Sequence, residues 1–292
     1  MVESYKERIL KNRSKCLFMC LLPFFVMNGS GVYAAAQDED SESLATVSSD
    51  QLKEKRGLVY EVKSKTPYTG LGRTNYPGGQ KKKVTSWVNG KKEGLQTEWY
   101  ESGQKRSEGS WVDGKKEGPV TSWHANGQKW VEENWVDGKQ DGSVTWWHEN
   151  GQKRVERSWV NGKEHGPWTV WHENGQKSLE GSWVNGKKLG SWTGWHKNGQ
   201  KEYEGNYVNG KLEGPSTSWH ENGQKKTEAN VVNHKTEGLR TEWYENGQKK
   251  TEENWVNGKR TGAMTWWHEN GQKKAEGNLV NGAPEDGPWT RW

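Results

Sequence analysis

Two short phrases recur every 24 residues in this chain, an aromatic phrase ending in Asn-Gly-Gln-Lys and a shorter phrase ending in Asn-Gly-Lys. The glycine of the first phrase never slips in spacing, falling at Gly79, Gly103, Gly127, Gly151, Gly175, Gly199, Gly223, Gly247 and Gly271. A fixed period of this size indicates a repeat architecture in which each unit stacks on its neighbours. The same regularity disfavours an enzyme, because catalysis needs one constellation of unlike residues.

Tryptophan replaces the usual aliphatic residues as the expected core. Only 29% of the residues are hydrophobic and the mean hydropathy is −1.21, values near those of disordered chains. However, the net charge is only +5 and there are 21 tryptophans, each of which can bury a large apolar area. The charge is also too small to favour a nucleic-acid partner, which would require a concentrated basic stripe.

Each unit contains two strand-length segments separated by turn residues. In the unit from Gly94 to Glu117, extended runs end at Glu101-Ser102-Gly103-Gln104 and at Asp113-Gly114. Asn-Gly or Asp-Gly between two such runs is a strong hairpin signal, because both turn residues need positive φ. The sequence therefore predicts an all-β fold, an elongated antiparallel β-hairpin meander or solenoid-like repeat array of about 18 strands.

The length of the turns decides which columns share a face. If both turns have two residues, Trp99 faces Arg106 and Thr97 faces Glu108, so the Trp99, Thr97, Glu108 and Val112 columns share one face. The Trp111 column then lies on the other face with the His/Tyr and Lys columns. A bulge at either turn would flip one strand and bring the two Trp columns together. The sequence leaves both arrangements open.

The N-terminus differs from the repeats. Five basic residues between Lys6 and Lys15 precede an apolar run, Cys16 to Met27, and then small residues at 34–36. This order predicts a signal peptide at 1–36 and an exported protein in the periplasm, cell envelope or outside the cell, with an uncleaved membrane anchor as the alternative. Both cysteines lie in this segment, so the mature chain would contain no thiol. An acidic, Ser-rich flexible linker is expected at 37–55, and the repeats at 56–292.

The repeated phrases resemble the bacterial MORN-repeat-variant family, often described as YwqK-type antitoxins. The resemblance rests on Trp-Tyr-Glu-Asn-Gly-Gln-Lys-Lys at 243–250 and Asn-Trp-Val-Asn-Gly-Lys at 254–259. It implies a β-hairpin array that acts as a scaffold or interaction surface, since related arrays are linked to membranes and protein assembly. It implies no catalytic residue and no cofactor.

The recurring polar residues are expected to be structural rather than catalytic or metal-binding. Histidines of one column are about 9.6 Å apart, two strand spacings, whereas the ligands of one zinc ion each lie about 2 Å from it. Tyr100 and Tyr244 occupy the same position as the histidines, which indicates a position for a flat amphipathic ring. The glutamates repeat in one environment, unlike the paired carboxylates of a glycosidase. We therefore predict no catalytic, cofactor or metal site.

Some tryptophans do not follow the two regular columns and vary from repeat to repeat. Core packing is the simplest interpretation of the regular columns, and an exposed ladder that stacks on sugar rings is the alternative. The irregular tryptophans are better candidates for a specific binding surface: Trp130, Trp146, Trp168, Trp192, Trp266 and Trp289.

The repeat pattern is interrupted at two places. Asn233-His234 replaces Asn-Gly, which predicts a weak hairpin because positive φ is costly for histidine. The last unit has an extra residue near Ala283 and reaches Trp292 after one strand. This terminal strand is a candidate for edge-strand self-association, and the alternative is a truncated array.

Together these features predict an exported, non-enzymatic repeat scaffold that binds a protein partner or a cell-envelope component. The first alternative is carbohydrate binding through an exposed Trp ladder. An antitoxin-like role in toxin neutralisation is a further alternative. A hydrolase built on the Glu and His columns is the least favoured.

Overall fold

The computed structural model describes residues 44–280, 283–284 and 290–292. The predicted signal peptide at 1–36, the start of the predicted linker and Trp289 lie outside the described residues. No helix of the described ranges is long and apolar enough to cross a membrane.

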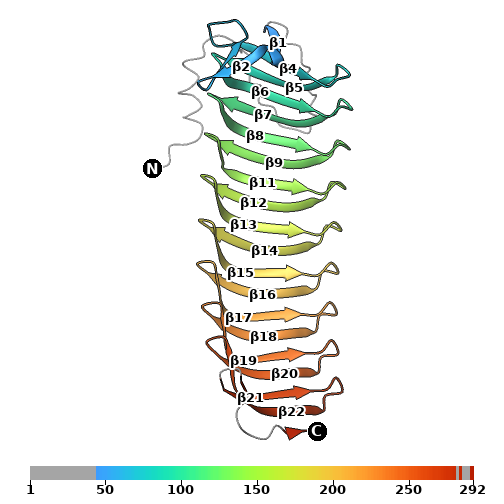
Figure 1. Ribbon diagram of the computed structural model, residues 1–292. Helices are drawn as coiled ribbons and strands as arrows, with labels where there is room; N and C mark the ends of the chain where they lie inside the picture. The colour runs from blue at the N-terminus through green and yellow to red at the C-terminus, as the bar shows by residue number, and fades with distance from the viewer. Residues whose placement is uncertain (1–43, 281–282, 285–289) are drawn as a thin grey trace, which may run out of the picture. The chain divides into compact units, whose positions relative to one another are not determined.

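The described chain is almost entirely β-strand, and the hairpins follow one another along one sheet (Figure 1). The strands that end in tryptophan are β6 (Lys91–Trp99), β8 (Lys115–Trp123), β13 (Lys163–Trp171), β15 (Lys187–Trp195), β17 (Lys211–Trp219), β19 (Lys235–Trp243) and β21 (Lys259–Trp267). Asp141 divides the equivalent strand into β10 (Lys139–Gln140) and β11 (Gly142–Trp147). The strands that end in valine are β5 (Lys81–Val88), β7 (Lys105–Val112), β9 (Lys129–Val136), β12 (Lys153–Val160), β14 (Lys177–Val184), β16 (Lys201–Val208), β18 (Lys225–Val232), β20 (Lys249–Val256) and β22 (Lys273–Val280).

The first strands form a distinct N-terminal end of the sheet. They are β1 (Thr46–Ser48), the 3-10 helix η1 (Ser49–Gln51), β2 (Leu52–Lys55), β3 (Leu58–Glu61) and β4 (Gly70–Asn75). Strand β1 pairs in parallel with β4, while β2 and β3 form a separate hairpin. Within the predicted linker at 37–55, residues 46–48 pair with β4 and residues 52–55 pair with β3. The last short strands, β23 (Ala283–Pro284) and β24 (Thr290–Arg291), both pair with β22.

The predicted antiparallel meander is confirmed, with each long strand paired to the strands before and after it. Strands have eight or nine residues, as the turn spacing predicted. The sheet of the described residues contains 22 strands rather than about 18, because β1, β23 and β24 are added at its ends and one repeat strand is divided into β10 and β11.

The two turns of each unit have different lengths. Asp113 and Gly114 have φ of 50° and 81°, and Val112 pairs with Lys115, which makes the predicted two-residue turn. The other turn is longer: the Tyr100 amide donates to the Gln104 carbonyl and the Gly103 amide to the Tyr100 carbonyl. This is a three-residue loop with glycine in the left-handed region, and it leaves a bulge before the next strand.

This bulge corrects the predicted register. Trp99 pairs with Lys105 instead of Arg106, while Thr97 still pairs with Glu108. The Lys105 column therefore lies on the same face as the Glu108 column, not on the opposite face. The two Trp columns stay on opposite faces. Trp111 is three residues after Glu108 on a regular strand and pairs with Gly94, so its side chain lies on the face opposite to those of Glu108 and Trp99.

The sheet consequently has two different faces. The outer face carries the Thr97, Trp99, Lys105, Glu108 and Val112 columns, each defined by its first member and a 24-residue period. The core face carries the Trp111 column and most of the buried residues, among them Val120, Val131, Val144, Trp192, Val231, Met264 and Leu279.

A second irregularity bends each tryptophan-ending strand. Between the pairs Ser110–Glu117 and Gly109–Val120, β8 contains two more residues than β7. One of them, Gly118, has φ of 74°, a conformation that glycine adopts without strain. Extra residues of this kind bend a strand. The bent sheet is concave on its core face, and side chains on that face can bury one another.

Candidate binding surface

The His/Tyr column connects each repeat to the next. The Nε2 atom of His172 lies 2.9 Å from the carbonyl oxygen of Trp195, 23 residues later. The same bond forms at His124, His148, His196 and His220, with distances from 3.0 to 3.3 Å. The hydroxyls of Tyr76, Tyr100 and Tyr244 donate to the equivalent carbonyls at 2.8–2.9 Å. Histidine and tyrosine are interchangeable here because both donate a hydrogen bond from the far edge of a flat ring.

The Glu and Lys columns pair with each other on the outer face. Lys105 Nζ lies 2.6 Å from Glu108 Oε2, which also accepts a hydrogen bond from Thr97 Oγ1 at 3.3 Å. Equivalent ion pairs recur at Lys129–Glu132, Lys153–Glu156, Lys177–Glu180, Lys201–Glu204, Lys225–Glu228, Lys249–Glu252 and Lys273–Glu276. Among the described residues, no three His, Cys, Asp or Glu side chains form a group that could hold a metal ion.

The core face carries the positions that vary most. The variable slot is the position of Gln96, and its later members are Val120, Val144, Trp168, Trp192, Ser216, Arg240 and Met264. Two members fit their neighbours closely: Trp192 pairs with Gly205 and its ring lies over Gly181, and Arg240 pairs with Glu253. The variable slot therefore gives different hairpins different neighbours across the core face.

Four aromatic side chains form a cluster in the middle of the core face. The ring centroid of Trp192 lies 5.2 Å from that of Trp168, 5.7 Å from that of Trp183 and 5.9 Å from that of Tyr207. Trp192 is only 1% exposed, and a Cβ atom at Gly181 would overlap its indole ring. The aromatic cluster is therefore a packed part of the core.

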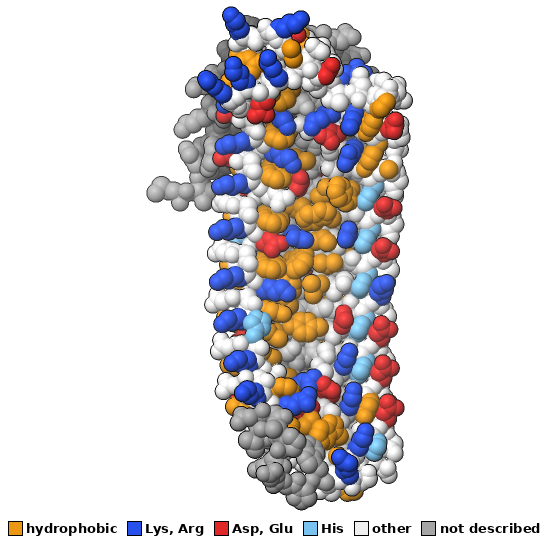
Figure 2. Space-filling model, viewed as in Figure 1, with side chains coloured by type: hydrophobic (Ala, Val, Ile, Leu, Met, Phe, Trp, Pro, Cys, Tyr) orange, Lys and Arg blue, Asp and Glu red, His pale blue; other side chains and the backbone are white. Residues whose placement is uncertain are grey.

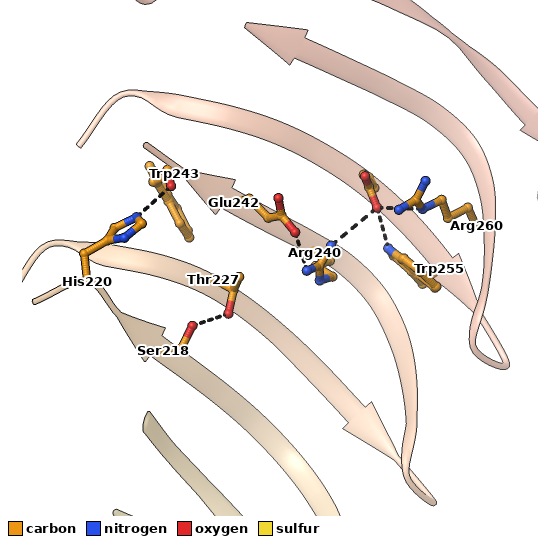
Figure 3. A network of polar contacts seen from close by, with 9 residues as sticks. Ser218, His220, Thr227, Arg240, Glu242, Trp243, Trp255 and Arg260 are labelled. Carbon is orange, nitrogen blue, oxygen red and sulfur yellow. Dashed lines mark hydrogen bonds and ion pairs between the residues drawn. The ribbon is translucent and has the colours of Figure 1, made fainter. Parts of the chain in front are cut away.

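A buried carboxylate occupies the same face near the C-terminal end. Glu253 is 3% exposed, and its carboxylate contacts Arg240, Trp255 and Arg260, which are labelled in Figure 3. Its Oε2 lies 3.1 Å from Arg260 Nε, 3.7 Å from Arg240 Nη1 and 3.1 Å from Trp255 Nε1, which donates to it. Arg240 also contacts Glu242. Charges can be buried here because cations and an indole N–H surround the carboxylate.

The exposed margin of the core face, beside the His/Tyr column, is basic. This basic margin is the column that begins at Lys82 and continues with Arg106, Trp130, Arg154, Ser178, Glu202, Lys226, Lys250 and Lys274. All but Ser178 are exposed, and Glu202 is its one acidic member. Figure 2 looks onto this face, with a band of hydrophobic side chains along its middle and a column of histidines beside the margin.

The family of the chain follows from these repeated hairpins. A family model described as MORN repeat variant matches residues 92–113, 116–137, 140–161, 164–185, 188–209, 212–233, 236–257 and 260–281. These matches cover more than half of the chain. The protein belongs to the MORN repeat variant family. The MORN repeat itself also matches at 158–167, 180–191 and 203–217. No curated protein matches the chain.

Each of the first seven MORN-variant matches runs from the second residue of a tryptophan-ending strand, or of its counterpart β10, to the first residue of the two-residue turn. One match is therefore one hairpin, closed by the longer turn. MORN repeats form interaction scaffolds, which confirms the scaffold class predicted from the sequence.

The irregular tryptophans all lie on the core face where they are described, but in different surroundings. Trp130 is 46% exposed in the basic margin, with its ring centroid 6.3 Å from that of His124. Trp146 and Trp168 are half-buried, with the Arg157 guanidinium over both rings at 5.0 and 5.3 Å. Trp266 is also half-buried. Trp192 has almost no accessible surface, so of these residues Trp130 offers the most area to a partner.

The outer face has a hollow of about 520 Å³ where Asp141 interrupts the strand. It is lined by Pro119, Glu132, Glu133, Asn134, Gly142, Ser143, Thr145, Trp147 and Lys153. Sequence reasoning missed this hollow, since it depends on a local break between β10 and β11. A sequence difference that accompanies the hollow is Ser143, a small residue at the repeat position where Pro119 and Pro167 stand.

Proposed function

We propose that this MORN-variant protein is a non-enzymatic scaffold that binds a protein segment along its core face. The observation that carries this proposal is the unequal distribution of variation between the two faces. The outer face repeats the same Trp, Thr, Lys and Glu in unit after unit, whereas the variable slot and the basic margin of the core face change between units beside the recurring Trp111 column. A surface that recognises one partner needs such differences, and stacked repeats offer them along a continuous line.

The chemistry of the core face defines the partner segment. Trp130 is an exposed aromatic anchor, and tryptophan and arginine are the residues most enriched among strong contributors to protein interfaces. Six of the nine residues of the basic margin are lysine or arginine. The segment that fits combines apolar side chains with acidic side chains that face the basic margin.

The bonding of the recurrent polar residues supports a role without catalysis. The His124-type rings bond to backbone carbonyls, and the Glu108-type carboxylates pair with lysines. A general acid or base needs a side chain that can reach a substrate proton. The His/Tyr column instead joins neighbouring hairpins, and the Glu column pairs with groups of its own hairpin.

The site of action is proposed from the sequence alone. The basic and apolar segment at 1–36 leads us to propose export to the periplasm, cell envelope or outside the cell. N-terminal sequencing of the protein purified from its own cells tests this, with cleavage near residue 36 expected. A chain that retains residue 1 and stays in the cytoplasm would contradict export.

Partner capture with matched variants tests the protein-binding proposal. We expect Trp130→Ala with Arg154→Ala to reduce recovery of the captured partner at least about tenfold, because both side chains are exposed on the core face. Val136→Thr, an exposed change on the outer face, should leave recovery unchanged. Equal recovery by all three proteins, or loss only with Val136→Thr, would contradict the assignment to the core face.

The outer-face hollow favours a second candidate, carbohydrate binding. Trp147 provides an aromatic surface, and Glu132, Asn134 and Thr145 provide polar groups around it. Aromatic faces with a few placed polar groups are common in small-ligand sites. Glycan-array binding that is lost in Trp147→Ala but retained in Trp171→Ala would support this site. Binding to no glycan, or equal loss in both variants, would rule it out.

A further inference from the structure

A pocket of about 310 Å³ lies where the N-terminal hairpin β2–β3 covers the first strands of the sheet. It is lined by Ser49, Leu52, Lys53, Glu54, Val59, Thr74, Lys83, Thr85, Trp87 and Lys92. Unlike the repeated columns, this constellation occurs once in the described chain, because only the first repeat lies under a hairpin.

Positive charge dominates the lining of this N-terminal pocket. Three lysines face one glutamate, Glu54. Lys83 also pairs with Glu98 outside the pocket, at 2.9 Å. Lys92 Nζ lies 4.0 Å from the ring centroid of Trp111, and no carboxylate of the described residues forms an ion pair with it.

Comparison with other repeats shows why Lys92 lacks a carboxylate. At its position in later units, Lys116 Nζ lies 3.7 Å from Glu133 and Arg260 Nε lies 3.1 Å from Glu253. The positions that would supply these two carboxylates to Lys92 are Gly109 and Thr85. The chain thus keeps the cation in the first unit but omits both of its partners.

The surroundings make this cation costly in the empty pocket. Burial lowers the pKa of Lys92, and the nearby charges of Lys83 and Lys116 lower it further, against a smaller opposing effect of Glu98. An anion would remove this penalty, because an opposite charge favours the protonated amine.

Neutral donors complete the lining. Trp87 Nε1 is buried and has no acceptor among the described residues. Thr85 and Ser49 also line the pocket with hydroxyl groups, and Ser49 Oγ accepts a hydrogen bond from the Thr74 hydroxyl at 2.9 Å. Buried indole N–H groups without an acceptor also occur at Trp135, Trp159, Trp168, Trp183 and Trp192, so the Trp87 indole adds a donor to this pocket without itself marking a site.

We propose that this N-terminal pocket binds a small ligand that carries a divalent oxyanion, a phosphate or sulfate group. Two negative charges and several acceptor oxygens match the ammonium groups of Lys83 and Lys92 and the indole N–H of Trp87. The pocket is larger than one such group, and Leu52 and Val59 provide apolar contact for the rest of the ligand. This inference is independent of the partner proposed for the core face.

Calorimetric titration of the full chain with inorganic phosphate and with sulfate, at constant ionic strength, tests the proposal. We expect saturable binding to one site, weakened at least about tenfold by Lys92→Gln, because a charged hydrogen-bond partner is lost. Lys188→Gln is the matched control. Lys188 occupies the same repeat position and lies 4.1 Å from the ring centroid of Trp192, but it is outside the N-terminal pocket. Its substitution should change the Kd less than about twofold.

A second variant and an NMR measurement distinguish loss of the binding site from misfolding of the Lys92→Gln protein. Trp87→Phe keeps an aromatic ring but removes the indole N–H, and it should also weaken binding. In the parent protein, phosphate should shift the NMR signal of the Trp87 indole proton. The proposal fails if no saturable binding occurs, if Lys188→Gln weakens binding as much as Lys92→Gln, or if the dicarboxylate succinate binds as tightly as phosphate.

Discussion

His172 Nε2 donates a hydrogen bond to the carbonyl oxygen of Trp195, at 2.9 Å, and so joins two successive hairpins through a side chain. A carbonyl oxygen only accepts, so the imidazole must carry its proton on Nε2. The bond recurs along the chain beside the three-residue turns. It joins each repeat to the next, in addition to the backbone hydrogen bonds of the sheet.

Substitution of His172 tests this connection. We expect His172→Ala to destabilise the hairpins around it by about 1 kcal/mol, the usual value of one hydrogen bond. His172→Tyr should be nearly neutral, because tyrosine makes the same bond at Tyr100. The rate of hydrogen exchange at the amides near Trp195 measures the local stability of both variants. Equal exchange in the two variants would show that the ring hydroxyl does not replace the imidazole.

The close fit of Trp192 against Gly181 predicts strong coupling between the two positions. Gly181→Ala should destabilise the protein by about 1–3 kcal/mol through overpacking. The same change in a Trp192→Ala background should cost much less, because the methyl group then has room. Urea unfolding measures the cycle, with Ser182→Ala, at an exposed neighbour, as the control. Additive effects would contradict direct contact.

The charge of the buried Glu253 carboxylate should stabilise the folded protein, because it lies between two arginines. Glu253→Gln keeps an acceptor for Trp255 but removes the charge between Arg240 and Arg260. We expect a loss of about 3 kcal/mol, as when one partner of a buried ion pair is removed. Lys249→Gln, which breaks an exposed pair with Glu252, should cost less than about 1 kcal/mol in the same unfolding experiment.

Tyr203 should make stability fall at alkaline pH. Burial raises the pKa of its phenol, and its hydrogen bond with Tyr207 raises it further. The folded protein therefore retains a proton that the unfolded chain loses, so the free energy of unfolding should decrease as pH rises above about 10. The decrease should be smaller in Tyr203→Phe. An equally steep decrease in that variant would assign the effect to other groups.

The 24-residue period was sufficient to predict the hairpins and the strand lengths, and the resemblance to the MORN-repeat-variant family implied the scaffold class. It could not predict the side of the sheet taken by Lys105, because the bulge depends on whether the turn after Trp99 has two or three residues. The pattern around 233–234 remains a prediction of a weak hairpin. His234 adopts φ of 65° there, and its amide bond to the Leu212 carbonyl is 3.3 Å, longer than the bonds of the glycines in the equivalent turns.

The candidate binding surface could be predicted only in part, because the sequence does not show which variable side chains are exposed. The variability of Trp130 and Trp192 marked both, but one is exposed and the other buried. Trp130 lies in the basic margin near a turn, whereas Trp192 lies in the variable slot with its ring over Gly181, a difference that only the register of the strands reveals. The N-terminal pocket was not predicted, because β2 and the residues before it that line the pocket fall in the segment 37–55, whose composition predicts a flexible linker.

Site-specific photo-crosslinking tests the central claim, that the core face recognises the partner and the outer face serves as a framework. A photoreactive amino acid would replace Trp130 on the core face and, separately, Val136 on the outer face, both of which are exposed. We expect crosslinking to one protein partner from position 130 and none from position 136. Crosslinking from position 136 alone would contradict the account.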